Sequence, residues 1–211
     1  MVKHAVIICH PRGRAFTRLT AQTYIDAVKA KGHEVVVRDL YGMNFDPRLQ
    51  SDELPDAAGA KPRPEVLIER MMLKDVDVFA LFYPIWFGSP PAMMKGYVER
   101  VLGTGFGYAA IKDGGSTPLL VGRKLISFTS TGSENVWLVD SGAWAAVRKI
   151  FDERLCVACG LEALDHVNFG GVDADMNPDR ASEAIEQVRE AVTDLFPAAP
   201  PKAGRKAAAK H

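Results

Sequence analysis

Short apolar runs alternate along the chain with longer segments that have helical spacing. Runs rich in β-branched or aromatic residues predict five strands, at Val2–Cys9, Glu34–Asp39, Val78–Tyr83, Lys124–Ser130 and Ala163–Phe169. The segments between and after them predict helices at about Phe16–Lys31, Glu65–Asp75, Ala92–Leu102, Ala143–Ala158 and Asp179–Leu195. This alternation is typical of a parallel sheet that is covered by helices on both faces.

The order of these elements also predicts a topology. Five parallel strands joined by right-handed crossovers most often adopt the order 2-1-3-4-5, which is the flavodoxin-like order. We therefore predict an α/β fold, a three-layer α/β/α flavodoxin-like sandwich formed by one domain over residues 1–196. Loops at His10–Ala15, Pro84–Pro91 and Thr131–Gly142 follow strands one, three and four, so they should converge at one edge of the sheet.

Charge and composition narrow the classes of partner. Lys and Arg total 26, as do Asp and Glu, but residues 197–211 hold four of the basic residues and no acid, which leaves a formal charge of −4 on residues 1–196. That body has no basic field for nucleic acid. We predict a disordered basic tail over 197–211. Because Met1 leads directly into a strand and no apolar run reaches a membrane span, we expect a cytoplasmic protein with no membrane span.

Two further features have more than one interpretation. The long polar stretch from Met43 to Lys61 suggests a lobe over the surface or part of a dimer contact. Cys156 and Cys159 form a C-x-x-C that could bind metal or form a dithiol, but without a second pair we interpret both as buried near a helix end, and we expect no metal site.

The three loops carry candidate chemistry, and each also has an ordinary interpretation. The first, HPRGRAFT, could hold phosphate oxygens with Arg12 or Arg14, Thr17 and the start of a helix. The second places Trp86, Phe87 and Gly88 where a flat ring could bind, although such aromatics also pack in cores. The third supplies hydroxyl groups and backbone donors, or is simply a turn. The histidines are scattered and no acid–base set stands out, so we expect no catalytic side chain, as when a cofactor performs the electron chemistry.

These loops also carry a resemblance. The motifs HPRGRAFT, DLYGMNFDPRL, YPIWFGSPPAMMKGYVERV with FGY behind it, and FTSTGSENVW occur in the same order as in the NAD(P)H:quinone oxidoreductase (DT-diaphorase) family. The chain resembles this family of flavodoxin-like flavoproteins from the first strand to the last helix. Its members bind a flavin non-covalently, FAD or FMN, and the resemblance leaves open which of the two this chain holds.

The resemblance implies a set of site residues and a reaction. The flavin contacts carried over are His10, Arg14, Ala15, Phe16, Thr17, Pro84, Ile85, Trp86, Phe87, Gly88, Thr129, Ser130, Thr131, Gly132 and Trp137, and the acceptor pocket would use Phe106, Tyr108 and Trp137. The implied enzyme is an NAD(P)H dehydrogenase (quinone). It would transfer hydride from NAD(P)H through flavin N5 to quinones, azo or nitro compounds by a ping-pong route, as a homodimer.

The chain also departs from the family pattern. Ala15 stands where the family often has serine, and the trio Trp86, Phe87 and Gly88 replaces a polar residue followed by two aromatics. Trp137 occupies the place of a tyrosine, and the histidine that follows that tyrosine has no counterpart, so we do not expect a Tyr–His proton relay. An alternative function is a regulatory flavoprotein subunit of a potassium efflux system, and a one-electron flavodoxin carrier is a third hypothesis.

Overall fold

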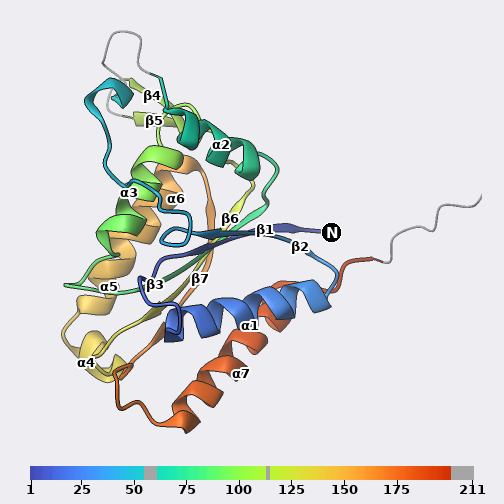
Figure 1. Cartoon of the computed structure of the whole chain (residues 1–211), viewed down its shortest axis with the longest axis vertical. Helices are drawn as coiled ribbons and strands as arrows, with labels where there is room; N and C mark the ends of the chain where they lie inside the picture. Colours follow the sequence, from blue (N-terminus) through green and yellow to red (C-terminus); the bar gives the residue numbers. More distant parts are fainter. Residues whose placement is uncertain (55–60, 113–114, 201–211) are drawn as a thin grey trace, which may run out of the picture.

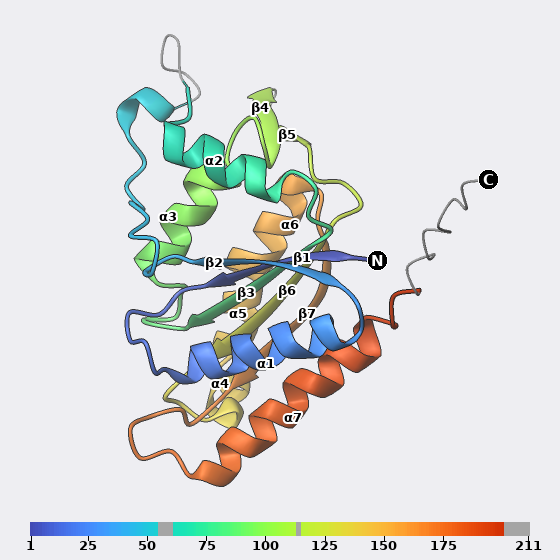
Figure 2. The same ribbon diagram turned by 45° about the vertical axis from the view of Figure 1, so that its right-hand side comes forward.

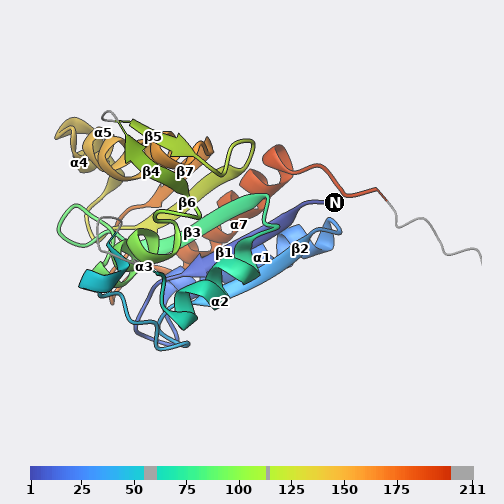
Figure 3. The same cartoon turned by 90° about the horizontal axis from the view of Figure 1, so that it is seen from above.

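The fold is a five-stranded parallel sheet between two layers of helices. The computed structural model describes residues 1–54, 61–112 and 115–200. The strands lie in the order β2-β1-β3-β6-β7, with β2 at Glu34–Asp39, β1 at Lys3–Ile8, β3 at Val78–Pro84, β6 at Lys124–Ser130 and β7 at Glu162–Phe169. Figure 3 shows them fanning from β2 to β7. The predicted flavodoxin-like order is confirmed.

Alternation along the central strand divides the apolar side chains between two cores. On β3, Phe79, Leu81 and Tyr83 face one core, and Val78, Ala80 and Phe82 face the other. All seven residues of β3 are buried, as expected of a parallel strand covered on both faces. Helices α1 (Phe16–Ala30) and α7 (Pro178–Leu195) cover one face, while α2 (Pro64–Leu73) and α3 (Ala92–Val101) lie over the other (Figures 1 and 2).

Three parts of the chain differ from the prediction. The third loop contains a short helix, α4, at Asn135–Asp140. The predicted helix Ala143–Ala158 is present but divided into α5 (Ala143–Val147), a π-helical turn η2 (Arg148–Glu153) and α6 (Arg154–Cys159). A hairpin of β4 (Tyr108–Lys112) and β5 (Gly115–Pro118) lies between α3 and β6. Helix α4 has six residues and the two hairpin strands have five and four, which is too short to give a periodic signal.

The stretch after Met43 lies over α3. Of the two predictions for it, a surface lobe or part of a dimer contact, the single chain shows the surface lobe. Its residues 55–60 lie outside the described part. A 3₁₀ turn, η1 (Ser51–Glu53), places Glu53 against the buried Arg100 of α3, at 2.9 Å between Oε1 and an Arg nitrogen. A Cβ at Gly96 would lie 2.1 Å from the Pro47 carbonyl oxygen, so only glycine permits this approach.

The end of the described chain returns to α1. The His33 Nε2 lies 3.0 Å from the Pro197 carbonyl oxygen, and the Ala199 N–H donates to the Lys31 carbonyl at 2.7 Å. Residues 201–211 of the predicted tail lie outside the described part. Within residues 1–54, 61–112 and 115–200, no helix has the length and apolar character required to cross a membrane.

A buried histidine at the start of the sheet predicts a pH dependence of stability. His4 is fully buried, and burial followed by the charge of His33 lowers its pKa to about 4. Its Nδ1 is hydrogen-bonded to the Tyr24 hydroxyl at 2.8 Å, and its Nε2 has no partner among the described residues. Since the unfolded chain binds a proton near pH 6.5 and the folded chain only near pH 4, acidification favours the unfolded state.

We expect the free energy of unfolding to fall between pH 6.5 and pH 4, with His4 contributing up to about 3 kcal/mol of the loss. Urea melts of the wild type and of the double variant His4→Phe with Tyr24→Phe, which leaves no unpaired polar atom on either ring, would measure the difference. Equal losses in both proteins over this pH range would show that His4 is not the group responsible.

Candidate functional site

The three predicted loops meet at the carboxyl ends of the strands. The Ile85 N–H donates to the Ser130 carbonyl at 2.8 Å, which joins the second loop to the third. The rings of His10 and Trp86 lie edge to face with 6.1 Å between their centres, which joins the first loop to the second. Because the crossovers place β1 beside β3 and β3 beside β6, these contacts follow from the topology.

The first loop ends at a helix terminus that no side chain caps. Ala15 is the N-cap residue of α1, and the first turn holds no acidic residue. Its free N–H groups and the positive end of the helix dipole are of the kind that can hold an anion. Arg14 is exposed, and no acidic side chain of the described residues pairs with it. Phe16 packs edge to face on Phe169, with ring centres 5.3 Å apart, and Thr17 is buried in the same turn.

The ion pair of Arg18 with Asp39 fixes the shape of the first loop, and we did not predict its role. Arg18 contacts the carboxylate at 2.5 and 2.9 Å and also donates to the carbonyls of His10 and Arg12. Burial alone would raise the pKa of Asp39, but hydrogen bonds from Arg18 and the Gly42 N–H outweigh it and lower the pKa. This ion pair could have been inferred from the sequence, because Arg18 lies in the first turn of α1 and Asp39 is the last residue of the neighbouring strand β2.

His10 is a neutral donor in this loop. Burial, helped by the charges of Arg18 and Arg12, lowers its pKa below the ordinary value. The Arg12 N–H donates to His10 Nδ1 at 3.1 Å, so in the neutral ring Nε2 carries the proton. The loop therefore presents this N–H in addition to the donors of the helix terminus.

The second loop projects an aromatic turn from the edge of the sheet. Pro84 ends β3 and Ile85 continues it, after which Trp86 and Ser89 exchange backbone hydrogen bonds at 3.0 and 3.1 Å. The two residues between them have positive φ, 51° at Phe87 and 71° at Gly88, which is the pattern of a type I′ turn. Phe87 is fully exposed and Trp86 is 43% exposed, so both rings are available to a ligand and the core interpretation is wrong.

The third loop presents backbone groups and turns some of its side chains inward. Gly132 has nothing within 4 Å of a built Cβ, so the backbone is open there. The Thr131 N–H donates to the Phe169 carbonyl at 2.9 Å, which fixes the loop against β7. Thr129 is 2% exposed, and its hydroxyl is bonded to His166 and Asn168 in the interior. Ser130 and Thr131 are also buried, and the Thr131 hydroxyl is bonded to Ser133 and Asn168, so among these residues the backbone remains the candidate for direct contact.

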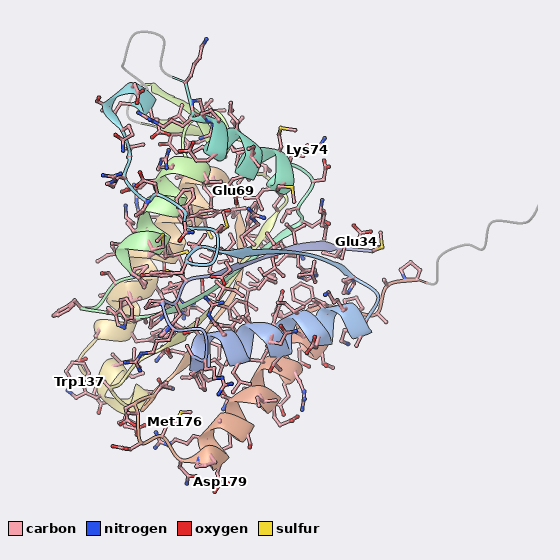
Figure 4. The ribbon with its side chains drawn as sticks, viewed as in Figure 1. Glu34, Glu69, Lys74, Trp137, Met176 and Asp179 are labelled. Carbon is pink, nitrogen blue, oxygen red and sulfur yellow. The ribbon has the colours of Figure 1, made fainter. Side chains whose placement is uncertain are left out.

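Trp137 belongs to the third loop, whereas the predicted residues Phe106 and Tyr108 lie apart from this cluster within one chain. Trp137 is 60% exposed on α4, at the outer edge of the molecule toward Met176 (Figure 4). Phe106 lies under the Arg70 guanidinium, whose carbon is 6.0 Å from the ring centre. Tyr108 lines a cavity of about 550 Å³ near the far end of α3. The ten residues of α3, about 15 Å of helix, separate Phe106 and Tyr108 from the second loop.

A polar cluster lies beneath the third loop. His166 of β7 is paired with Asp152 of η2, and both side chains are almost fully buried. We did not expect such a pair, because the two residues are 14 positions apart and no motif links them. The sequence did contain one sign of a polar cluster. Polar residues stand at alternate positions in two strands that should be apolar on both faces, at Ser127 and Thr129 in β6 and at His166 and Asn168 in β7.

The cysteines belong to the core. Cys156 and Cys159 are buried and free, and burial raises their pKa values to about 12 and 11. Within the described residues, no group of His, Cys, Asp and Glu side chains could hold a metal ion.

Comparisons with known proteins agree with this geometry. A family model described as "Flavodoxin-like fold" matches residues 2–195. An uncharacterized NAD(P)H oxidoreductase of Haemophilus influenzae is 31% identical over 185 residues, which cover 87% of this chain and 90% of the relative. The chain belongs to the NAD(P)H:quinone oxidoreductase family of flavodoxin-like proteins. The resemblance expected from the four motifs is thereby confirmed.

Two further relatives extend the comparison. NAD(P)H dehydrogenase [quinone] 1 of Cavia porcellus is 29% identical over 63% of this chain, which spans only 54% of that relative. The solved NAD(P)H:quinone oxidoreductase of Methanothermobacter marburgensis has a TM-score of 0.81 at 22% identity, covering 92% of this chain and 96% of that one. At this identity the structural likeness supports the fold of the NAD(P)H:quinone oxidoreductase family.

Proposed function

We propose that this protein is a flavin-dependent NAD(P)H dehydrogenase (quinone). The observation that carries the proposal is the exposed aromatic turn at Trp86–Ser89, which is held against His10 and joined to Ser130 beside the uncapped start of α1. These groups together offer apolar faces and backbone donors for a flavin ring, and an anion site for the phosphate attached to it.

The residues present fit such a group. The N–H groups at Phe16 and Thr17 with Arg14 would hold the phosphates, because the helix terminus has no other cap. Trp86, Phe87 and Gly88 would contact the ring, and the open backbone around Gly132 would face its polar end. Since Ala15 offers no hydroxyl, the phosphate would depend more on Arg14.

A second cavity bears on which flavin is bound. It has a volume of about 200 Å³ and lies between the first loop, the third loop and α7, beside Phe16, Asn168 and Arg180. An adenosine group attached to phosphates at the start of α1 would have this space available. The cavity therefore favours FAD over FMN.

When bound, the flavin would accept hydride from NAD(P)H at N5 and pass two electrons to a quinone or a similar acceptor. The chain's own contribution is to place the reactants within about 3–3.5 Å and to exclude water. Trp86 and Phe87 supply an apolar surface for this purpose. Because both substrates would use one face of the ring in turn, we infer a ping-pong route.

The proposal includes a homodimer, in which the partner would bring its Phe106 and Tyr108 region to the ring. The large cavity beside Tyr108 is bordered by exposed apolar residues, among them Leu49, Leu54 and Ile150. A second copy covering this surface would remove it from water. We expect sedimentation at the dimer mass, and Ile150→Glu should shift the protein to monomer and lower quinone reduction. A monomeric wild type with full activity would contradict this part of the proposal.

The direct test of the function is the cofactor and the kinetics of the purified protein. We expect a yellow protein that releases FAD on boiling, identified by chromatography, and parallel lines when NAD(P)H and quinone are both varied. Release of FMN would overturn only the choice of flavin. A colourless protein that takes up neither flavin would overturn the function itself.

The aromatic turn gives a matched pair of variants. Gly88 and Gly122 both have positive φ, 71° and 83°, and nothing within 4 Å of a built Cβ. Valine at either position should cost about 1–2 kcal/mol of stability, because the conformation is strained for a residue with a Cβ. Only Gly88 lies in the second loop, so only Gly88→Val should weaken flavin retention. Equal flavin content in the two variants would show that this loop does not contact the ring.

A further inference from the structure

Polar side chains from two neighbouring strands form a buried chain beneath the third loop. Ser127 and Thr129 of β6 alternate with apolar residues, and so do His166 and Asn168 beside them on β7. Asp152 reaches this face from η2, a π-helical turn of the kind often found at functional sites. Because buried polar groups must be hydrogen-bonded, the positions of their protons can be worked out.

The orientation of the amides is fixed by one backbone carbonyl. The Asn168 carbonyl can only accept, so the group 2.9 Å away on Asn135 is its Nδ2. Asn135 Oδ1 is then an acceptor and faces Asn168 Nδ2 at 2.7 Å. The other N–H of that amide donates to Thr131 Oγ1 at 3.0 Å, whose own proton goes to the Ser133 carbonyl. Asn168 Oδ1 is therefore directed at Thr129.

The chain then fixes the protons on the imidazole. The Thr129 hydroxyl donates its single proton to Asn168 Oδ1 at 2.8 Å. Its oxygen lies 2.8 Å from His166 Nε2, so that nitrogen must be the donor. His166 Nδ1 faces the Asp152 carboxylate, and two acceptors do not pair without a proton. One more proton therefore lies between them, which makes the pair an imidazolium and a carboxylate, neutral in sum.

The charged and titratable groups around His166 come from several elements. Asp152 belongs to η2, Asp165 accepts from the His166 backbone N–H at 2.7 Å, and Trp144 of α5 covers the ring at 4.6 Å between centres. Tyr83 of β3 lies 6.4 Å away, and burial followed by the charge of Asp152 raises its pKa well above the usual value. Asp152 Oδ1 accepts from Ser127 at 3.2 Å. No second cation of the described residues pairs with Asp152, so His166 is its counter-charge.

We propose that His166 is a positioning residue for the third loop, doubly protonated against Asp152 and acting through Thr129 and Asn168 to hold residues 131–135 in place. The proposal rests on the proposed function, because it assigns a purpose to a loop expected to contact the flavin. The Tyr–His pair of the family has no counterpart in this chain. The His166–Asp152 pair lies at a different place, in the interior below the third loop.

Two variants separate positioning from folding. In Asp152→Asn the amide N–H donates to His166 Nδ1 while Nε2–H still donates to Thr129, so every hydrogen bond of the chain survives with a neutral ring. In His166→Leu, made together with Asp152→Asn so that no buried charge loses its counter-charge, the chain is broken at Thr129. We expect this double variant to speed hydrogen exchange at residues 131–135 and to weaken binding of added FAD and FMN about tenfold, as loss of an outer supporting partner does elsewhere. Asp152→Asn should stay within about twofold of the wild type in both, since no hydrogen bond of the chain is lost.

Nitrogen NMR of the histidine side chains gives a readout that does not depend on flavin. The wild-type apoprotein should show His166 with both ring nitrogens protonated, and Asp152→Asn should show one protonated nitrogen. A single protonated nitrogen in the wild type, or unchanged exchange at 131–135 in the double variant, would overturn the proposal. If the wild type takes up no flavin, the proposed function fails, but the NMR and exchange results on the apoprotein still decide the role of His166.

Discussion

The register of β3 against β6 is the constraint on which the site depends. Tyr83 pairs with Thr129 and Pro84 with Ser130, and the Ile85 N–H then donates to the Ser130 carbonyl as the second loop leaves the sheet. This bond fixes where the aromatic turn begins and where the third loop turns away. A slip of one residue would exchange the two faces of the strand, burying Phe82 where Tyr83 now lies. The positions of the aromatic turn and of the polar chain below it are thus set together.

The same register explains why one region of the sheet is polar inside. His166 lies opposite Ser127, and Asn168 lies opposite Thr129, so their side chains share a face. The π-helical turn η2 brings Asp152 onto that face. Removing one partner of a buried ion pair lowers the stability of the fold, because a charge is left without a partner. In this cluster each polar side chain from Asp152 to Asn135 has a hydrogen-bond partner. The site therefore combines exposed aromatic residues above with a fixed polar support below.

The sequence predicted the five strands because each contains a short run rich in β-branched or aromatic residues, and it predicted the edge where the loops meet because parallel topology leaves little choice. It missed α4 because that helix has six residues and only Leu138 is buried. The position of the second loop could be predicted, but local sequence left open whether its aromatic side chains are exposed or packed in the core. The exposure of Phe87 depends on a turn with positive φ at a non-glycine residue. The pairing of His166 with Asp152 was not predictable, because it requires a π-helical turn and a strand register that no local pattern encodes.

The central claim is that three loops at the carboxyl ends of β1, β3 and β6 together hold a flavin. Hydrogen exchange of the apoprotein, followed by mass spectrometry with and without added FAD, tests it most directly. With FAD bound, the account predicts slower exchange in three separate segments, residues 13–19, 86–89 and 131–135. In the Ile150→Glu variant, which is expected to be monomeric, FAD should not change exchange in the β4–β5 hairpin. Protection confined to one segment, or located away from these loops, would contradict it.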